Sequence, residues 1–87
     1  MSTADLIRAR LAALDPETLQ LEDESAQHRG HAGAAGGGGH FRLTIVSPRF
    51  DRLSTLARHR LVYDALGEMM QREIHALSIT ALTPEEL

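Results

Sequence analysis

Residues 40–46 read HFRLTIV, and this stretch decides the kind of fold that the chain can form. Its apolar residues Phe41, Leu43 and Ile45 are separated by single polar residues, which is the period-two pattern of a strand with one buried face. Ser47 and Pro48 follow, and proline cannot donate a hydrogen bond to the ladder of a central strand. The sequence therefore predicts a half-buried strand that ends before Pro48.

Downstream of this strand, residues 54–70 carry apolar side chains at helical spacing. Ser54 is a good N-cap for the predicted helix. The residues at i, i+3, i+4 and i+7 positions, which predict its buried face, are Leu56, His59, Val62, Tyr63, Leu66, Met69 and Met70. Gly67 weakens a helix interior by about 1 kcal/mol relative to Ala. We therefore expect the helical stretch to break or bend at Gly67.

Residues 74–83, IHALSITALT, alternate again and predict another strand. Leu77, Ile79 and Ala81 share one face, and the residues between them share the other. A long helical connection before this strand suits a parallel crossover to residues 40–46. The last residues, 84–87, are predicted to form a polar tail of about one helical turn.

Upstream, residues 18–23 (TLQLED) predict a shorter alternating strand, and the residues before Asp15 predict a helix. Ser2 or Thr3 can cap this helix, and Asp5 is placed to complete a capping box with Ser2. Its apolar residues at helical spacing are Leu6, Ile7, Leu11 and Leu14. Pro16 disfavours the helical conformation in the residue before it, so the helix is predicted to end at that point.

These elements predict one α/β (α+β) domain over residues 1–87, with a three-stranded mixed sheet and helices packed on one face. The order is α-β-β-α-β, or α-β-β-α-α-β if the second helical stretch divides at Gly67. A chain of 87 residues is enough for one small domain. Aromatic residues make up only 3% of the chain, so the core is predicted to be aliphatic.

Residues 24–39 differ from the rest of the chain, because they are rich in glycine and histidine. They contain the run Gly36 to Gly39 and no apolar residue larger than Ala. Such a segment cannot bury enough surface to offset its backbone entropy. We predict a mobile loop, and long loops inside small domains often carry function.

The composition limits the chemistry of the protein. The net charge of −3 argues against coating nucleic acid through the overall field of the protein. The chain has no Cys, so any metal site needs imidazole, and any sulfur must come from a partner. The five histidines are His28, His31, His40, His59 and His75. No stretch approaches the roughly 18 apolar residues of a membrane span, and the N-terminus is too charged for a secretory signal, so we expect a cytoplasmic protein.

Two segments together carry a family resemblance. Residues 47–66, SPRFDRLSTLARHRLVYDAL, and residues 74–79, IHALSI, resemble the signature region of BolA-like proteins. Residues 19–28, LQLEDESAQH, and residues 40–47, HFRLTIVS, are similar to the strand, loop and strand of that family. The resemblance implies a type II KH-like fold of α-β-β-α-α-β order. The chain departs from the family at Arg52, where members often have Gly, and in its richer glycine loop, which adds His31.

The resemblance also implies a [2Fe–2S] cluster that is shared with a monothiol (CGFS-type) glutaredoxin and glutathione. It implies that His75, the histidine of the IHAL element, is a cluster ligand, and that His28 occupies the loop position where relatives carry a His or Cys ligand. His31 and His40 are alternative loop ligands. By alternation alone, His75 shares a face with Leu77 and Ile79 and could simply be a histidine at the edge of the core.

The expected function is therefore that of an accessory protein in iron–sulfur cluster assembly, transfer or iron sensing. We expect no enzyme, because the sequence contains no P-loop, Rossmann fingerprint or recognisable nucleophile and base. The alternative is a KH-like, DNA-binding transcriptional regulator. In that case Arg58 and Arg60 are the candidate nucleic-acid or partner contacts, exposed on either side of a packed His59. The acidic balance and the absence of a GxxG element argue against this alternative.

Overall fold

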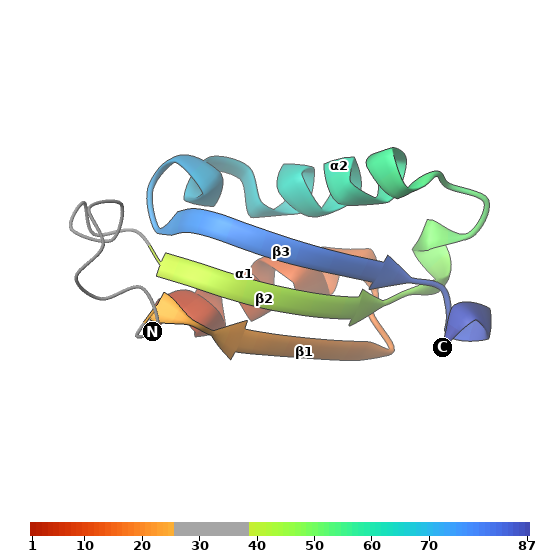
Figure 1. Ribbon diagram of the computed structural model, residues 1–87, viewed down its shortest axis with the longest axis horizontal. Helices are drawn as coiled ribbons and strands as arrows, with labels where there is room; N and C mark the ends of the chain where they lie inside the picture. The colour runs from red at the N-terminus through yellow and green to blue at the C-terminus, as the bar shows by residue number, and fades with distance from the viewer. Residues whose placement is uncertain (26–38) are drawn as a thin grey trace.

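The domain consists of a three-stranded sheet and two α-helices (Figure 1). The computed structural model describes residues 1–25 and 39–87. The strand order is β1-β2-β3, where β1 is Thr18–Asp23, β2 is Gly39–Val46 and β3 is Ile74–Leu82. β2 pairs antiparallel with β1 and parallel with β3, which confirms the predicted mixed sheet. The mobility predicted for the loop at 24–39 concerns mainly residues 26–38, which lie outside the described residues.

The first helix, α1 (Thr3–Leu11), begins with the predicted capping box. The Ser2 hydroxyl accepts a hydrogen bond from the Asp5 N–H at 3.1 Å, and the Asp5 carboxylate accepts one from the Ser2 N–H at 3.3 Å. A 3-10 turn, Ala12–Leu14, follows the helix. Asp15 then adopts a φ of +49°, which turns the chain into β1. The α-helix itself ends at Leu11, earlier than expected, and the 3-10 turn carries the helical stretch to Leu14, just before Asp15 and Pro16.

The second helix, α2 (Thr55–Leu66), is capped by the Ser54 hydroxyl, which accepts a hydrogen bond from the Ala57 N–H at 3.1 Å. Gly67 ends it with a φ of +57°, a conformation that side-chain-bearing residues rarely adopt. The chain continues as a short 3-10 helix, Gly67–Gln71. The predicted division at Gly67 is confirmed, because the positive φ of this glycine turns the chain out of the α-helical path before the 3-10 helix begins.

One face of the sheet packs against both helices and forms the hydrophobic core. The buried members of this core are Ile7, Leu11, Leu14, Phe41, Leu43, Ile45, Phe50, Val62, Leu66, Met69 and Ile74. The opposite face carries polar or small side chains, and its exposed members are Gln20, Glu22, Arg42, Ala76, Ser78 and Thr80. The predicted alternation is therefore confirmed over residues 19–22 in β1, 41–45 in β2 and 77–81 in β3. Among the described residues, no helix has the length and apolar character to span a membrane.

The predicted buried face of α2 is partly wrong. Leu56 is 62% exposed and Tyr63 is 41% exposed, although both were expected in the core. The helix instead turns Leu61 and Ala65 towards the core beside its fully buried residues. The apolar residues of α2 surround more than half of the helix, and contacts with α1 and the sheet select which of them are buried.

Candidate metal-ligand site at one end of the sheet

A β-bulge at the start of β3 determines where His75 lies. Gly39 lies opposite Ile74, but His40 lies opposite Ala76, so His75 is the extra residue on β3. Ile74 is buried at 2% exposure, whereas His75 is exposed. The expectation that His75 shares a face with Leu77 is therefore wrong, because the bulge breaks the alternation before Leu77. His75 faces solvent instead of the edge of the core.

The bulge also places His75 beside His40, which is 35 positions earlier in the chain. The two imidazole ring centroids lie 4.9 Å apart, and the ring planes are tilted by 46°. The Nε2 atom of His40 is buried. The structure thus brings one predicted ligand next to one of its predicted alternatives, at the end of the sheet where β2 and β3 begin.

Hydrogen bonds hold the end of β1 against the start of β2 at this site. The Ser25 hydroxyl accepts from the His40 N–H at 3.0 Å, and the Glu24 N–H donates to the His40 carbonyl at 2.7 Å. The Ser25 N–H in turn donates to Asp23 Oδ1 at 2.9 Å. The hydrogen bonds from Ser25 lower the pKa of the Asp23 carboxyl. Both ends of the segment that carries His28 and His31 are therefore anchored next to His40.

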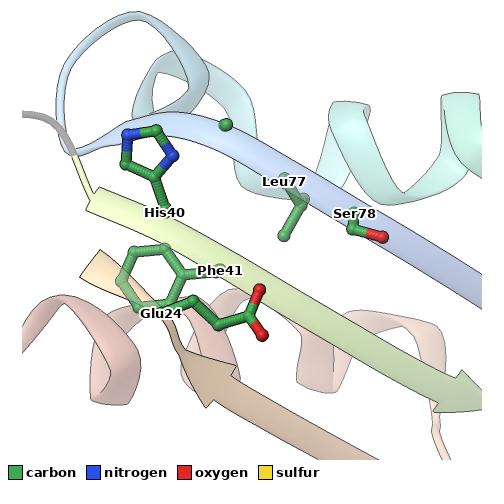
Figure 2. Close-up of a pocket in the computed structure, with 6 residues that line it drawn as sticks. Glu24, His40, Phe41, Leu77 and Ser78 are labelled. Atoms are coloured by element: carbon green, nitrogen blue, oxygen red, sulfur yellow. The ribbon is translucent and has the colours of Figure 1, made fainter. Parts of the chain in front are cut away.

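A shallow hollow of about 290 Å³ opens beside His40. Its lining residues are Glu24, His40, Phe41, Ala76, Leu77 and Ser78. In Figure 2 the His40 ring stands on the β3 side of β2, and the Glu24 side chain lies on the β1 side. The Glu24 carboxylate forms an ion pair with Arg42 at 3.3 Å. Periodicity along the chain does not reveal this hollow, although the small side chains of Ala76 and Ser78 on the polar face of β3 leave space there.

The other predicted ligands, His28 and His31, lie outside the described residues. Within residues 1–25 and 39–87, no group of three or more His, Cys, Asp or Glu side chains is arranged to hold a metal ion. The described part of the site therefore consists of the two imidazoles of His40 and His75.

The expectation that Arg58 is an exposed contact residue is wrong. Its side chain is only 13% exposed, and its guanidinium donates to the carbonyls of Leu53 at 2.9 Å and Ala81 at 3.1 Å. Glu86 accepts the remaining hydrogen bonds, and this interaction raises the pKa of Arg58. Arg60 is exposed as expected, and His59 is half-buried. Arg58 lies on the side of α2 opposite the exposed Leu56 and Tyr63, which accounts for its half-buried position.

Comparison with protein families matches residues 11–86 to the family of BolA-like proteins. The chain is 51% identical over 81 residues to BolA-like protein 1 of Mus musculus, which covers 92% of this chain and 57% of the relative. It is 48% identical over 79 residues to SufE-like protein 1, chloroplastic/mitochondrial, of Arabidopsis thaliana, which covers 85% of this chain and 21% of the relative. The chain thus spans little more than half of the first relative and about a fifth of the second.

Solved structures show the same fold. The BolA domain of SufE1 from Arabidopsis thaliana superposes with a TM-score of 0.84 at 44% identity, covering 100% of this chain and 99% of that one. BolA1 from Arabidopsis thaliana gives a TM-score of 0.84 at 38% identity, with coverages of 100% and 98%. The predicted family and the predicted α+β fold are both confirmed. The chain belongs to the BolA-like protein family.

Proposed function

We propose that this BolA-like protein shares a [2Fe–2S] cluster with a monothiol glutaredoxin and glutathione, as an accessory protein in cluster assembly, cluster transfer or iron sensing. The observation that carries the proposal is the exposed imidazole of His75 on the bulge of β3. A bulge re-aims a side chain that regular alternation would turn towards the core. In the proposed complex, this exposed imidazole is available to bind a metal that a partner brings.

The donor atoms of the chain fit a shared cluster. The chain has no Cys, and a [2Fe–2S] cluster accepts imidazole in place of two thiolates on one iron. A cysteine of the glutaredoxin and the thiol of glutathione supply the sulfur donors in this arrangement. This chain then has to contribute only two imidazoles, which must be neutral to coordinate.

We propose His28 as the second ligand from this chain, with His31 and His40 as alternatives. His28 follows Ser25 by three residues, and three residues of chain span at most about 11 Å. Ser25 is hydrogen-bonded to the backbone of His40, whose ring contacts that of His75. The covalent reach of the chain is therefore compatible with a ligand from the loop on the same side of the sheet as His75.

Anaerobic reconstitution tests the proposal directly. The protein is mixed with a CGFS-type glutaredoxin, glutathione, ferrous iron and sulfide, and the product is separated by size. We expect a red heterodimer whose absorption and circular-dichroism spectra differ from those of the glutaredoxin alone. His75→Ala should abolish this mixed-cluster spectrum, whereas His59→Gln, a change of the half-buried histidine on α2, should preserve it. A folded His75→Ala protein with an unchanged spectrum would remove His75 from the site.

Single substitutions in the loop identify the second ligand. We expect His28→Ala to weaken cluster sharing more than His31→Ala does, measured by titration of the glutaredoxin-bound cluster with each variant. The reverse order would assign the ligand to His31.

A further inference from the structure

The start of β2 is fixed in place on both sides. The Gly39 N–H donates to the carbonyl of Glu73 at 2.9 Å, immediately before β3 begins. The next residue, His40, donates its N–H to the Ser25 hydroxyl, and its carbonyl accepts from the Glu24 N–H, just after the end of β1. His40 is therefore held between both neighbouring strands, and its backbone cannot shift without breaking these bonds.

The packing below His40 adds to this restraint. A Cβ atom on Gly39 would lie 2.4 Å from Cε2 of Phe41. The backbone at Gly39 is therefore too close to the Phe41 ring to leave room for a side chain. Phe41 is itself only 4% exposed and packs in the core. The direction in which the His40 side chain leaves the sheet is consequently fixed by the core beneath it.

His75 has the opposite character. It is the extra residue of a bulge, and such a residue lies outside the regular pairing of the strands. Its side chain is exposed, so few contacts restrict its rotamers. The neighbouring ring that does restrict it is that of His40, at a centroid distance of 4.9 Å.

We propose that His40 is a positioning residue for His75, which removes it from the alternative ligands named above and leaves His31 as the alternative to His28. The ring of His40, which extends from a restrained backbone, limits the orientations of the His75 imidazole, so that His75 is already oriented when a metal centre approaches. The Nε2 atom of His40 is buried, so this nitrogen is not presented to a metal at the surface. Residues that orient a metal-binding histidine in this way stabilise metal binding without touching the metal. This assignment rests on the proposed function, because it gives His75 a metal to bind.

The first test uses the isolated protein and needs no cluster. Side-chain NMR relaxation of the His75 ring, with ring-to-ring nuclear Overhauser effects, reports how well His75 is oriented. We expect His40→Ala to mobilise the His75 ring and His40→Phe, which keeps an aromatic ring, to leave it ordered. Ser78→Ala, a change elsewhere on the rim of the hollow, should have no effect. An equally ordered His75 ring in His40→Ala overturns the positioning role.

The second test uses the complex with glutaredoxin. We expect His40→Phe to keep the mixed-cluster spectrum and its stability. His40→Ala should still form the cluster, but with an altered circular-dichroism spectrum and retention weaker by about 10- to 100-fold, the usual range for losing an orienting group. Equal loss of the spectrum in both variants, as in His75→Ala, would make His40 a ligand and overturn the proposal. A wild-type protein that forms no shared cluster would refute the proposed function, while the NMR experiment would still decide whether His40 orients His75.

Discussion

The Arg58 guanidinium forms a bidentate ion pair with the Glu86 carboxylate, with Nη1–Oε1 at 2.6 Å and Nη2–Oε2 at 3.1 Å. The pair joins α2 to the C-terminal 3-10 helix, Pro84–Glu86. The same guanidinium donates to the carbonyl of Ala81 in β3. The C-terminal residues, which the sequence presented as a polar tail, therefore hold α2 and β3 together.

This ion pair predicts an acid-sensitive contribution to stability. The hydrogen bonds from Arg58, and then from the Thr83 N–H, lower the pKa of Glu86 from 4.5 to about 2. Because the folded state holds this proton more weakly than the unfolded state, the stabilisation is fully present above about pH 5 and is lost as the pH falls to about 2. We expect Glu86→Gln to lower the unfolding temperature at pH 7 and to flatten its dependence on pH over this window.

Thermal unfolding of the wild type and of Glu86→Gln at a series of pH values measures this effect. Glu85→Gln is the matched control, because it removes the neighbouring exposed charge and leaves the ion pair with Arg58 in place. Parallel curves for the wild type and Glu86→Gln down to pH 2 would contradict the assigned role of the pair.

Arg52 predicts a stabilising substitution. It adopts a φ of +64°, and its side chain is 93% exposed with only a 4.0 Å ion pair to Asp51. A left-handed conformation costs a residue with a Cβ atom about 1–2 kcal/mol. Glycine avoids this cost, but it also makes the unfolded chain more flexible, which offsets part of the gain in stability. We expect Arg52→Gly to raise the free energy of unfolding by about 0.5–1 kcal/mol. Urea denaturation measures it, and Arg52→Ala, which keeps the Cβ atom, should give no comparable gain.

Gly39 predicts a destabilising substitution with a defined steric cause. A methyl group at this position would lie 2.4 Å from the buried Phe41 ring, so either the ring or the strand must move. We expect Gly39→Ala to cost about 1–3 kcal/mol of unfolding free energy, the usual range for forcing extra volume into packed surroundings. In a Phe41→Leu background the same change should cost less. An equal cost in both backgrounds, measured by urea denaturation, would show that the clash is not the cause.

The orientation of α2 predicts unequal effects of two similar leucine substitutions. Leu66 is fully buried, whereas Leu56 is 62% exposed. We expect Leu66→Ala to cost about 2–5 kcal/mol, and Leu56→Ala to change the free energy of unfolding by no more than about 0.5 kcal/mol. Chemical denaturation of both variants compares them under the same conditions. A large loss for Leu56→Ala would mean that the helix buries the face that its sequence first indicated.

The local elements could be predicted because their causes lie within a few residues. The capping box of Ser2 and Asp5 and the break at Gly67 each depend on local backbone and side-chain chemistry. The alternation of residues 40–46 predicted which side chains face the core, because neighbouring side chains of a regular strand point in opposite directions. The departure from the family at Arg52 coincides with a positive φ, at a turn where glycine has no steric cost.

The sequence by itself thus determined the order of the elements, the buried faces of the regular strands and the histidines available as ligands. Only the tertiary structure decided which side of α2 is buried. It also decided that the Arg58 guanidinium binds carbonyl groups and Glu86 within the domain. It also decided that a bulge turns His75 to solvent beside His40. The physical reason is that each of these features depends on pairing or packing between segments far apart in the chain, and periodicity within one segment carries no information about the register of its partner.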